Sequence, residues 1–175
     1  MSRFQDIDKM DIYELKPFFE DTTIEVSMRD YARLRKIGKT KATRILKEYT
    51  KQNILVRTTT GPRSPYKINS QSPKAKSLAQ LYWQEQLTIL IQKIKDKINP
   101  TGIVLVNEIS ELTNTKDTKI TLFLFGTFSY SLNRTEETQR LGRSIKLIAC
   151  PKLMQIPLNY RITASNGFIL DGEIL

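Results

Sequence analysis

The sequence predicts an α+β protein of two domains, and three observations support this. Residues 1–70 combine helical periodicity with two short segments rich in β-branched residues. A polar segment that contains Pro73, residues 69–77, then marks a change in composition. Beyond it, a long amphipathic helix precedes several apolar strands. We therefore expect one domain over residues 1–70, a linking helix over residues 71–99 and a second domain over residues 100–175.

The composition limits the chemistry and the environment of the chain. Its 175 residues include no histidine and one cysteine, Cys150, which excludes imidazole catalysis, an internal disulfide and the usual zinc sites. No apolar run approaches the length of a membrane span, and the acidic start does not resemble a signal peptide. A single cysteine is typical of a reducing compartment. We therefore expect a cytoplasmic protein that has no membrane partner.

Basic residues are concentrated in one segment of the chain. The formal net charge is +10. Residues 29–67 hold twelve basic and two acidic residues, a net of +10, so the rest of the chain sums to zero. Residues 1–28 hold seven acids and three bases. A basic segment beside an acidic one indicates a surface that binds a polyanion, and a solvated helix face is the ordinary alternative.

The basic segment has the pattern of two helices followed by a hairpin. Ser27 is expected to cap a helix over residues 28–37, and a second helix is expected after Gly38, over residues 39–53. The second helix has apolar residues at i, i+3, i+4 and i+7, which predict a buried stripe of Ala42, Ile45, Leu46 and Tyr49. The segments "ILVRTTT", "GPRS" and "PYKIN" then predict a hairpin. A preceding helix over residues 6–21 is expected to break at Pro17.

This order resembles a winged helix-turn-helix domain. The segment "SMRDYARLRKIGKTKATRILKEYTKQNILVR" is similar to that family's pattern, with Ala32 where the helices cross and Ile37-Gly38 in the turn. Lys36 departs from it, because many relatives have glycine there. The resemblance covers residues 27–68 and implies sequence-specific binding to double-stranded DNA, with the second helix in the major groove. The alternative is a winged helix that contacts only proteins.

Residues on the second helix and the hairpin are the expected contacts with DNA. Lysine and arginine would supply salt-dependent affinity for phosphates, and a bidentate arginine would read bases. The expected DNA-binding residues are Arg29, Lys39, Thr40, Lys41, Thr43, Arg44, Lys47, Arg57, Thr58, Arg63 and Ser64.

The second domain is expected to follow from a long amphipathic helix. Its apolar face consists of Trp83, Leu87, Leu90, Ile91, Ile94 and Ile98. This face predicts either core packing or the contact of a homodimer that reads two half-sites. The segment "IVLVNEISELTN" predicts a short strand and then a helix or loop, and "TKITLFLFG", "RSIKLIAC", "MQIPLNYRIT" and "GFILDGEIL" predict further strands.

Residues 122–132, "LFLFGTFSYSL", resemble the strand and Gly-Ser turn of minimal, polymerase-β-like nucleotidyltransferases. Archaeal proteins that join a winged helix to such a domain have the same order of elements, and the resemblance covers residues 78–175 loosely. Those enzymes hold Mg²⁺ with two carboxylates one residue apart on the next strand. Ser144 and Lys146 occupy those places, and "MQIPLNYRIT" lacks a third acid. The resemblance implies a degenerate, non-enzymatic domain without catalytic residues, metal ligands or cofactor.

The second domain is therefore expected to dimerise, to bind a protein partner or to bind a nucleotide ligand. Gly126, Thr127 and Lys146 are candidate phosphate-binding residues, and a fold-defining tight turn at Gly126 is the favoured alternative. The leading hypothesis for the chain is an archaeal-type transcriptional regulator. Its rivals are an active nucleotidyltransferase and an antitoxin-like protein-interaction module.

Overall fold

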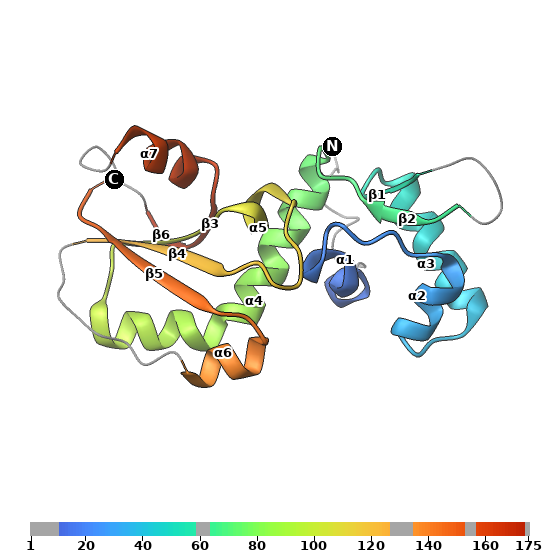
Figure 1. Cartoon of the computed structure of the whole chain (residues 1–175), viewed down its shortest axis with the longest axis horizontal. Helices are drawn as coiled ribbons and strands as arrows, with labels where there is room; N and C mark the ends of the chain where they lie inside the picture. The colour runs from blue at the N-terminus through green and yellow to red at the C-terminus, as the bar shows by residue number, and fades with distance from the viewer. Residues whose placement is uncertain (1–10, 59–63, 127–134, 153–156, 174–175) are drawn as a thin grey trace, which may run out of the picture. The chain divides into compact units, whose positions relative to one another are not determined.

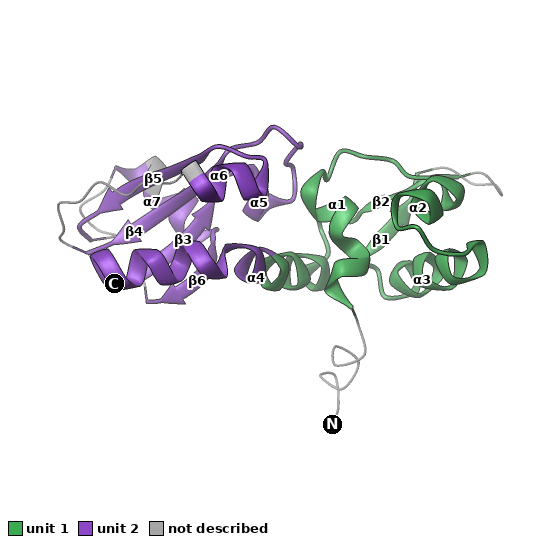
Figure 2. Ribbon diagram, turned by 90° about the horizontal axis from the view of Figure 1, so that it is seen from below, with its two compact units in different colours: residues 1–82 green, residues 83–175 purple. Residues whose placement is uncertain are grey.

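The computed structural model describes residues 11–58, 64–126, 135–152 and 157–173 (Figure 1). Arg63 and Thr127, two of the candidate site residues, lie outside these ranges. Helices and two separate β-sheets make up the fold, which confirms the α+β class. Figure 2 shows the two compact units of the chain, residues 1–82 and 83–175. They meet within the long helix α4 (Pro73–Ile98), so the predicted linking helix is shared between the units.

Unit 1 contains helices followed by a hairpin. Its elements before α4 are the 3₁₀ helix η1 (Ile12–Leu15), α1 (Lys16–Glu20), α2 (Met28–Leu34), α3 (Lys39–Lys51), β1 (Leu55–Arg57) and β2 (Tyr66–Ile68). β1 and β2 pair antiparallel, with Leu55 opposite Ile68, which confirms the predicted hairpin. Pro17 lies in the first turn of α1, where the N–H that proline lacks has no helical partner. Pro17 therefore begins a helix after η1 instead of breaking one.

The acidic segment before the basic one is part of the core of unit 1. Phe18 and Phe19 of α1 are fully buried, and the Phe18 ring stacks on Tyr31 of α2 with centroids 5.9 Å apart. The Tyr31 hydroxyl donates to the Glu14 carbonyl at 2.8 Å, and the Tyr49 hydroxyl donates to the Glu14 carboxylate at 3.1 Å. Burial raises the pKa of Tyr31 to about 12, and burial also raises the pKa of Tyr49. These hydroxyls hold η1 against α2 and α3.

Unit 2 is built on a four-stranded sheet. Its elements after α4 are β3 (Gly102–Val106), α5 (Glu108–Glu111), β4 (Ile120–Phe125), α6 (Thr135–Leu141), β5 (Ile145–Cys150), α7 (Leu158–Ser165) and β6 (Phe168–Gly172). The strand order is β5-β4-β3-β6, with β4 and β5 parallel and the other pairs antiparallel. Every residue of β3 and β4 is buried. Their continuous apolar sequences are typical of central strands that are covered on both faces.

The expectation of a strand in "MQIPLNYRIT" is wrong, because Leu158–Ser165 form helix α7. Pro157 lies at the N-cap with φ −53° and ψ 149°, the extended conformation that an N-cap residue typically has before a helix begins. Ala164 of α7 packs in the core against Val104 and Val106 of β3. The β-branched and aromatic residues of this segment favour a strand locally, but this packing against the sheet overrides that preference.

The apolar face of α4 lies in the core of its own chain. Trp83 is 2% exposed, and Leu87, Leu90 and Ile94 are fully buried. This burial confirms the core-packing interpretation and leaves the face unavailable as a dimer contact. Although α4 is long, no helix among the described residues has both the length and the apolar character needed to cross a bilayer.

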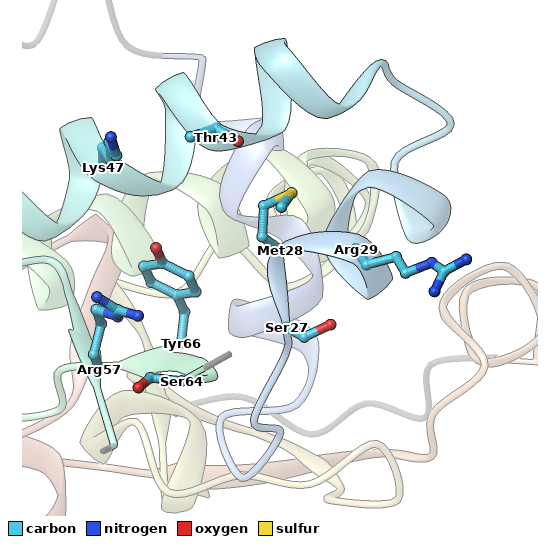
Figure 3. A pocket seen from close by; sticks show the side chains of 8 residues that line it. All are labelled: Ser27, Met28, Arg29, Thr43, Lys47, Arg57, Ser64 and Tyr66. Atoms are coloured by element: carbon cyan, nitrogen blue, oxygen red, sulfur yellow. The ribbon is translucent and has the colours of Figure 1, made fainter. Parts of the chain in front are cut away.

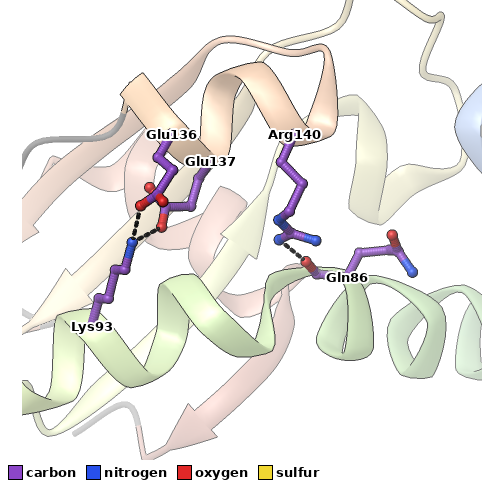
Figure 4. Close-up of polar contacts among 5 residues, drawn as sticks. All are labelled: Gln86, Lys93, Glu136, Glu137 and Arg140. Atoms are coloured by element: carbon purple, nitrogen blue, oxygen red, sulfur yellow. Dashed lines mark hydrogen bonds and ion pairs between the residues drawn. The ribbon is translucent and has the colours of Figure 1, made fainter.

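α6 is fixed to α4 by charged side chains (Figure 4). The Lys93 ammonium donates to the carboxylates of Glu136 at 2.6 Å and Glu137 at 2.5 Å, and Arg140 donates to the Gln86 carbonyl at 2.6 Å. The Glu137 side chain is only 2% exposed. Its hydrogen bond with Lys93 lowers the pKa of Glu137, and the bonds with Glu136 and Glu137 raise the pKa of Lys93. The acids of α6 therefore have an architectural role.

Candidate nucleic-acid interface

The first helix of the candidate interface begins with the predicted cap. The Ser27 hydroxyl accepts the Asp30 amide at 3.2 Å and donates to the Asp30 carboxylate at 2.6 Å. The first of these bonds satisfies one of the amide groups that the first turn of α2 leaves open. It places Arg29, which is exposed, in that first turn.

The turn between α2 and α3 has a left-handed residue at its centre. Lys36 has φ 51°, its amide donates to the Arg33 carbonyl at 3.2 Å, and the Ile37 amide donates to the Ala32 carbonyl at 3.0 Å. These two bonds form a Schellman motif, in which glycine usually occupies the left-handed position. A lysine there costs about 1 kcal/mol. Gly38 then forms the N-cap of α3.

α3 has one buried and one exposed face. The predicted stripe of Ala42, Ile45, Leu46 and Tyr49 is buried, which confirms the periodicity. Lys39, Thr40, Lys41, Arg44 and Lys47 are exposed on the remaining surface. Thr43 is half-buried, and its hydroxyl donates to the Lys39 carbonyl at 2.9 Å. Within the part of the chain that the structure describes, the four cations of this surface form no ion pair.

The hairpin presents its predicted residues in different environments. Arg57 is exposed, and its guanidinium carbon lies 5.6 Å from the centroid of the Tyr66 ring. The Thr58 hydroxyl donates to the Glu25 carboxylate at 3.3 Å. Ser64 is 5% exposed and therefore offers little surface for a direct contact with DNA. The sequence placed Ser64 in a polar turn, and in the structure it lines an open groove beside the hairpin.

An open groove separates α3 from the hairpin and the start of α2 (Figure 3). Its volume is about 670 Å³, and it is lined by Ser27, Met28, Arg29, Thr43, Lys47, Arg57, Ser64 and Tyr66. No carboxylate is among these lining residues. Ser27, Met28 and Tyr66 are the lining residues that the sequence did not identify as functional. The alternation of buried and exposed residues along β2 was the available signal for Tyr66.

Gly126 and Lys146, the candidate phosphate-binding residues of unit 2 that the structure describes, lie at different ends of the strands. Gly126 follows β4, where its amide donates to the Cys150 carbonyl at 3.0 Å, and its φ of 131° requires glycine. Lys146 pairs in register with Thr121, at the opposite end of the same two strands. Gly126 is five residues from Thr121, so the separation along the strands is about 16 Å. Gly126 and Lys146 therefore lie too far apart along the strands to hold one phosphate group together, and the structure does not describe the residues that follow Gly126.

The other reactive groups of unit 2 are also structural. Cys150 is buried at the end of β5, and burial raises the pKa of its thiol, which makes it a poor nucleophile. Within the described ranges, no three side chains of aspartate, glutamate, cysteine or histidine gather at a point where they could hold a metal ion.

Comparison of the chain with protein-family models, curated proteins and solved structures found no match. The function must therefore be inferred from the residues and geometry of this chain alone.

Proposed function

We propose that the protein binds double-stranded DNA sequence-specifically through unit 1, in the manner of a winged helix-turn-helix transcriptional regulator. One observation carries the proposal: α3 buries an apolar stripe and exposes cations that have no acidic partner among the described residues, Lys39, Lys41, Arg44 and Lys47 among them. Cations that no acid of the protein neutralises are available to phosphate groups, which release counterions on binding.

The arrangement of unit 1 suits a duplex. An α-helix fits the major groove, and the N-terminal part of the second helix is the part that enters it in domains of this type. Lys39 and Lys41 belong to the first turn of α3, and Arg44 lies one turn further on. We assign the lysines to phosphates and Arg44 to a guanine edge, since arginine can donate two parallel hydrogen bonds to one base. Arg29 and Arg57 flank this surface.

Unit 2 is proposed to be a catalytically inactive, nucleotidyltransferase-like partner or dimerisation domain of a cytoplasmic homodimer. The strand at which such an enzyme would hold its metal ions, β5, contains Lys146 and no carboxylate. A lysine repels the cations that the reaction needs. Any dimer contact must use surface other than the buried face of α4.

A mobility-shift experiment tests the proposal. The full chain would be mixed with a duplex selected from a random pool and, separately, with the same duplex scrambled, at 50 mM salt. We expect the chain to shift both duplexes at 50 mM salt but only the selected duplex at 200 mM salt, because non-specific affinity falls steeply with ionic strength. Absence of any shift at 50 mM salt would contradict the proposal.

Two controls separate the rival functions. Incubation with radiolabelled nucleoside triphosphates, Mg²⁺ and the selected duplex should transfer no label, and transfer would establish an active nucleotidyltransferase. A protein that co-purifies in a fixed ratio, together with no affinity for DNA, would establish an interaction module instead.

A further inference from the structure

Left-handed backbone conformations have an evident reason at most of the places where they occur. Among the residues that the structure describes, five other than glycine have a positive φ. Three of these are asparagines, which adopt this conformation readily: Asn53, Asn99 and Asn107. Leu112, with φ 57°, has a side chain that is 2% exposed, so its burial in the core offsets the strain. Lys36, with φ 51°, is exposed, and burial does not account for it.

The contacts of Lys36 within the fold do not account for it either. Its side chain forms no hydrogen bond or ion pair with the residues that the structure describes. The neighbouring Arg33 and Arg35 already place positive charge at the C-terminal end of α2, where such charge interacts favourably with the helix dipole. Arg33 also pairs with Asp30 at 3.5 Å. A third cation beside these arginines adds repulsion to the fold.

Lys36 lies next to the surface that is proposed to bind DNA. It is two residues before Gly38, the N-cap of α3, and three residues before Lys39 in the first turn of that helix. Since this end of the second helix enters the major groove in domains of this type, the turn before it comes near the phosphates that border the groove. A lysine is a point charge on a flexible stem, which suits a phosphate.

We propose that Lys36 binds a phosphate of the DNA backbone beside the major groove, and that this contact outweighs the strain that Lys36 adds to the turn. Strained residues are often found at binding sites, where the interaction with a ligand compensates for the strain. The contact rests on the proposed function, because it requires a duplex on α3. It makes the turn a place where stability is exchanged for affinity: glycine would relieve the strain and lose the phosphate.

Three replacements of Lys36 separate its charge from its backbone strain. Lys36→Asn removes the charge and places in the turn a residue that tolerates a positive φ. Lys36→Gly removes the charge and the strain together, whereas Lys36→Arg keeps both. Lys119→Asn, an exposed change in unit 2, is the control for a general loss of positive charge.

Fluorescence anisotropy of the full chain would measure the affinity of each variant for the selected and the scrambled duplex. Lys36→Asn and Lys36→Gly should each bind roughly tenfold more weakly at 50–100 mM salt, and the slope of log affinity against log salt should become shallower by about 0.9, the value for one phosphate contact. Both duplexes should lose affinity equally, because a backbone contact carries no sequence information. Lys36→Arg and Lys119→Asn should bind as the wild type does.

Thermal melting of the same variants excludes unfolding as the cause of weaker binding. Because glycine relieves the strain, Lys36→Gly should melt no lower than the wild type. A variant that is at least as stable as the wild type and binds DNA more weakly is the result that a phosphate contact predicts.

The outcomes distinguish the contact from the proposed function. If the wild type bound DNA and Lys36→Asn bound it as tightly, the phosphate contact would be wrong and the proposed function would stand. A loss in Lys36→Arg or in Lys119→Asn as large as that in Lys36→Asn would also contradict the contact, because the charge at this position would not be the cause. If the wild type bound neither duplex, the proposed function and the contact would both fail.

Discussion

The cations of unit 1 and of unit 2 have different surroundings. In unit 2, Lys93 bonds to two carboxylates and Lys95 pairs with Asp171 at 2.8 Å. Arg143, which lies over the Trp83 ring, also donates to the carbonyls of Thr115 and Thr118 at 2.8 Å. On α3, by contrast, Lys39, Lys41, Arg44 and Lys47 form no ion pair with any part of the chain that the structure describes. Lys93, Lys95 and Arg143 of unit 2 fasten its elements together, whereas these four cations of α3 face outward.

This difference is informative because charge alone does not reveal function. Paired cations stabilise the fold that contains them, and exposed unpaired ones contribute little to it. Removal of a paired cation of unit 2 should therefore lower the free energy of unfolding. Removal of an exposed cation of α3 should instead lower the affinity for DNA. The predictions below test that division, from the largest expected effect to the smallest.

Replacing Lys93 should have the largest effect on stability. The variant Lys93→Ala removes the cationic partner of Glu137, whose side chain is 2% exposed in the wild-type chain and whose Oε2 atom has no hydrogen bond among the described residues. Breaking a pair around a buried charge is strongly destabilising, and we expect the melting temperature to fall on the order of 10 °C. Calorimetry would measure this, with Lys41→Ala as the control that should shift melting by less than about 1 °C. An equal fall in melting temperature for the two variants would contradict the difference between the units.

The ion pair between Lys93 and Glu137 should also make the free energy of unfolding depend on pH. Lys93 depresses the pKa of Glu137, so the contribution of Glu137 is present above its unfolded pKa, about 4.3, and is lost as the pH falls through the folded value. The raised pKa of Lys93 gives a contribution that is present below about pH 10.4 and lost as the pH rises through the folded value. Urea unfolding between pH 3 and 7 should show a shallower acid decline for Glu137→Gln than for wild type. An unchanged acid decline would contradict this role of Glu137.

Replacing Arg44 should affect DNA binding and leave stability unchanged. Arg44 is exposed and forms no hydrogen bond or ion pair with other residues in the described ranges. Loss of one bidentate contact to a base costs about 1–3 kcal/mol, so Arg44→Ala should weaken binding to the selected duplex by about tenfold or more. Fluorescence anisotropy would measure the affinity, and Lys119→Ala, an exposed change in unit 2, is the control. If Arg44→Ala bound the selected duplex as tightly as the wild type does, Arg44 would not be part of the DNA interface.

Replacing Lys36, in the turn before α3, with glycine should stabilise the protein. Lys36 has φ 51°, which glycine adopts without the strain that a side chain imposes. We expect Lys36→Gly to raise the free energy of unfolding by about 1 kcal/mol, measured by urea denaturation. At the neighbouring Arg35, with φ −89°, the same replacement should destabilise the chain. A Lys36→Gly variant less stable than wild type would show that the Lys36 side chain contributes more than the backbone strain costs.

The sequence predicted those features that depend on local periodicity. The spacing of Ala42, Ile45, Leu46 and Tyr49 identified the buried stripe of α3, and Ser27 identified the start of α2. The same local reasoning predicted β4 and β5, because their β-branched and aromatic runs are bounded by turns.

Features that depend on distant contacts were missed or misassigned. Helix α7 was expected to be a strand, since only its packing on β3 reveals its state. The groove needs residues of α2, α3 and the hairpin at one place, and no spacing in the sequence specifies that. The bond between Lys93 and Glu137 likewise joins residues 44 positions apart.

The salt dependence of DNA binding tests the central claim most directly. The triple variant Lys39→Ala, Lys41→Ala, Arg44→Ala removes three outward cations of α3, and the matched variant Lys116→Ala, Lys119→Ala, Lys152→Ala removes three exposed cations of unit 2. If the α3 cations contact phosphate and base groups of DNA, the slope of log affinity against log salt should become shallower by about two to three for the α3 variant. The unit 2 variant should keep the wild-type slope. Identical slopes for the two variants would contradict the account.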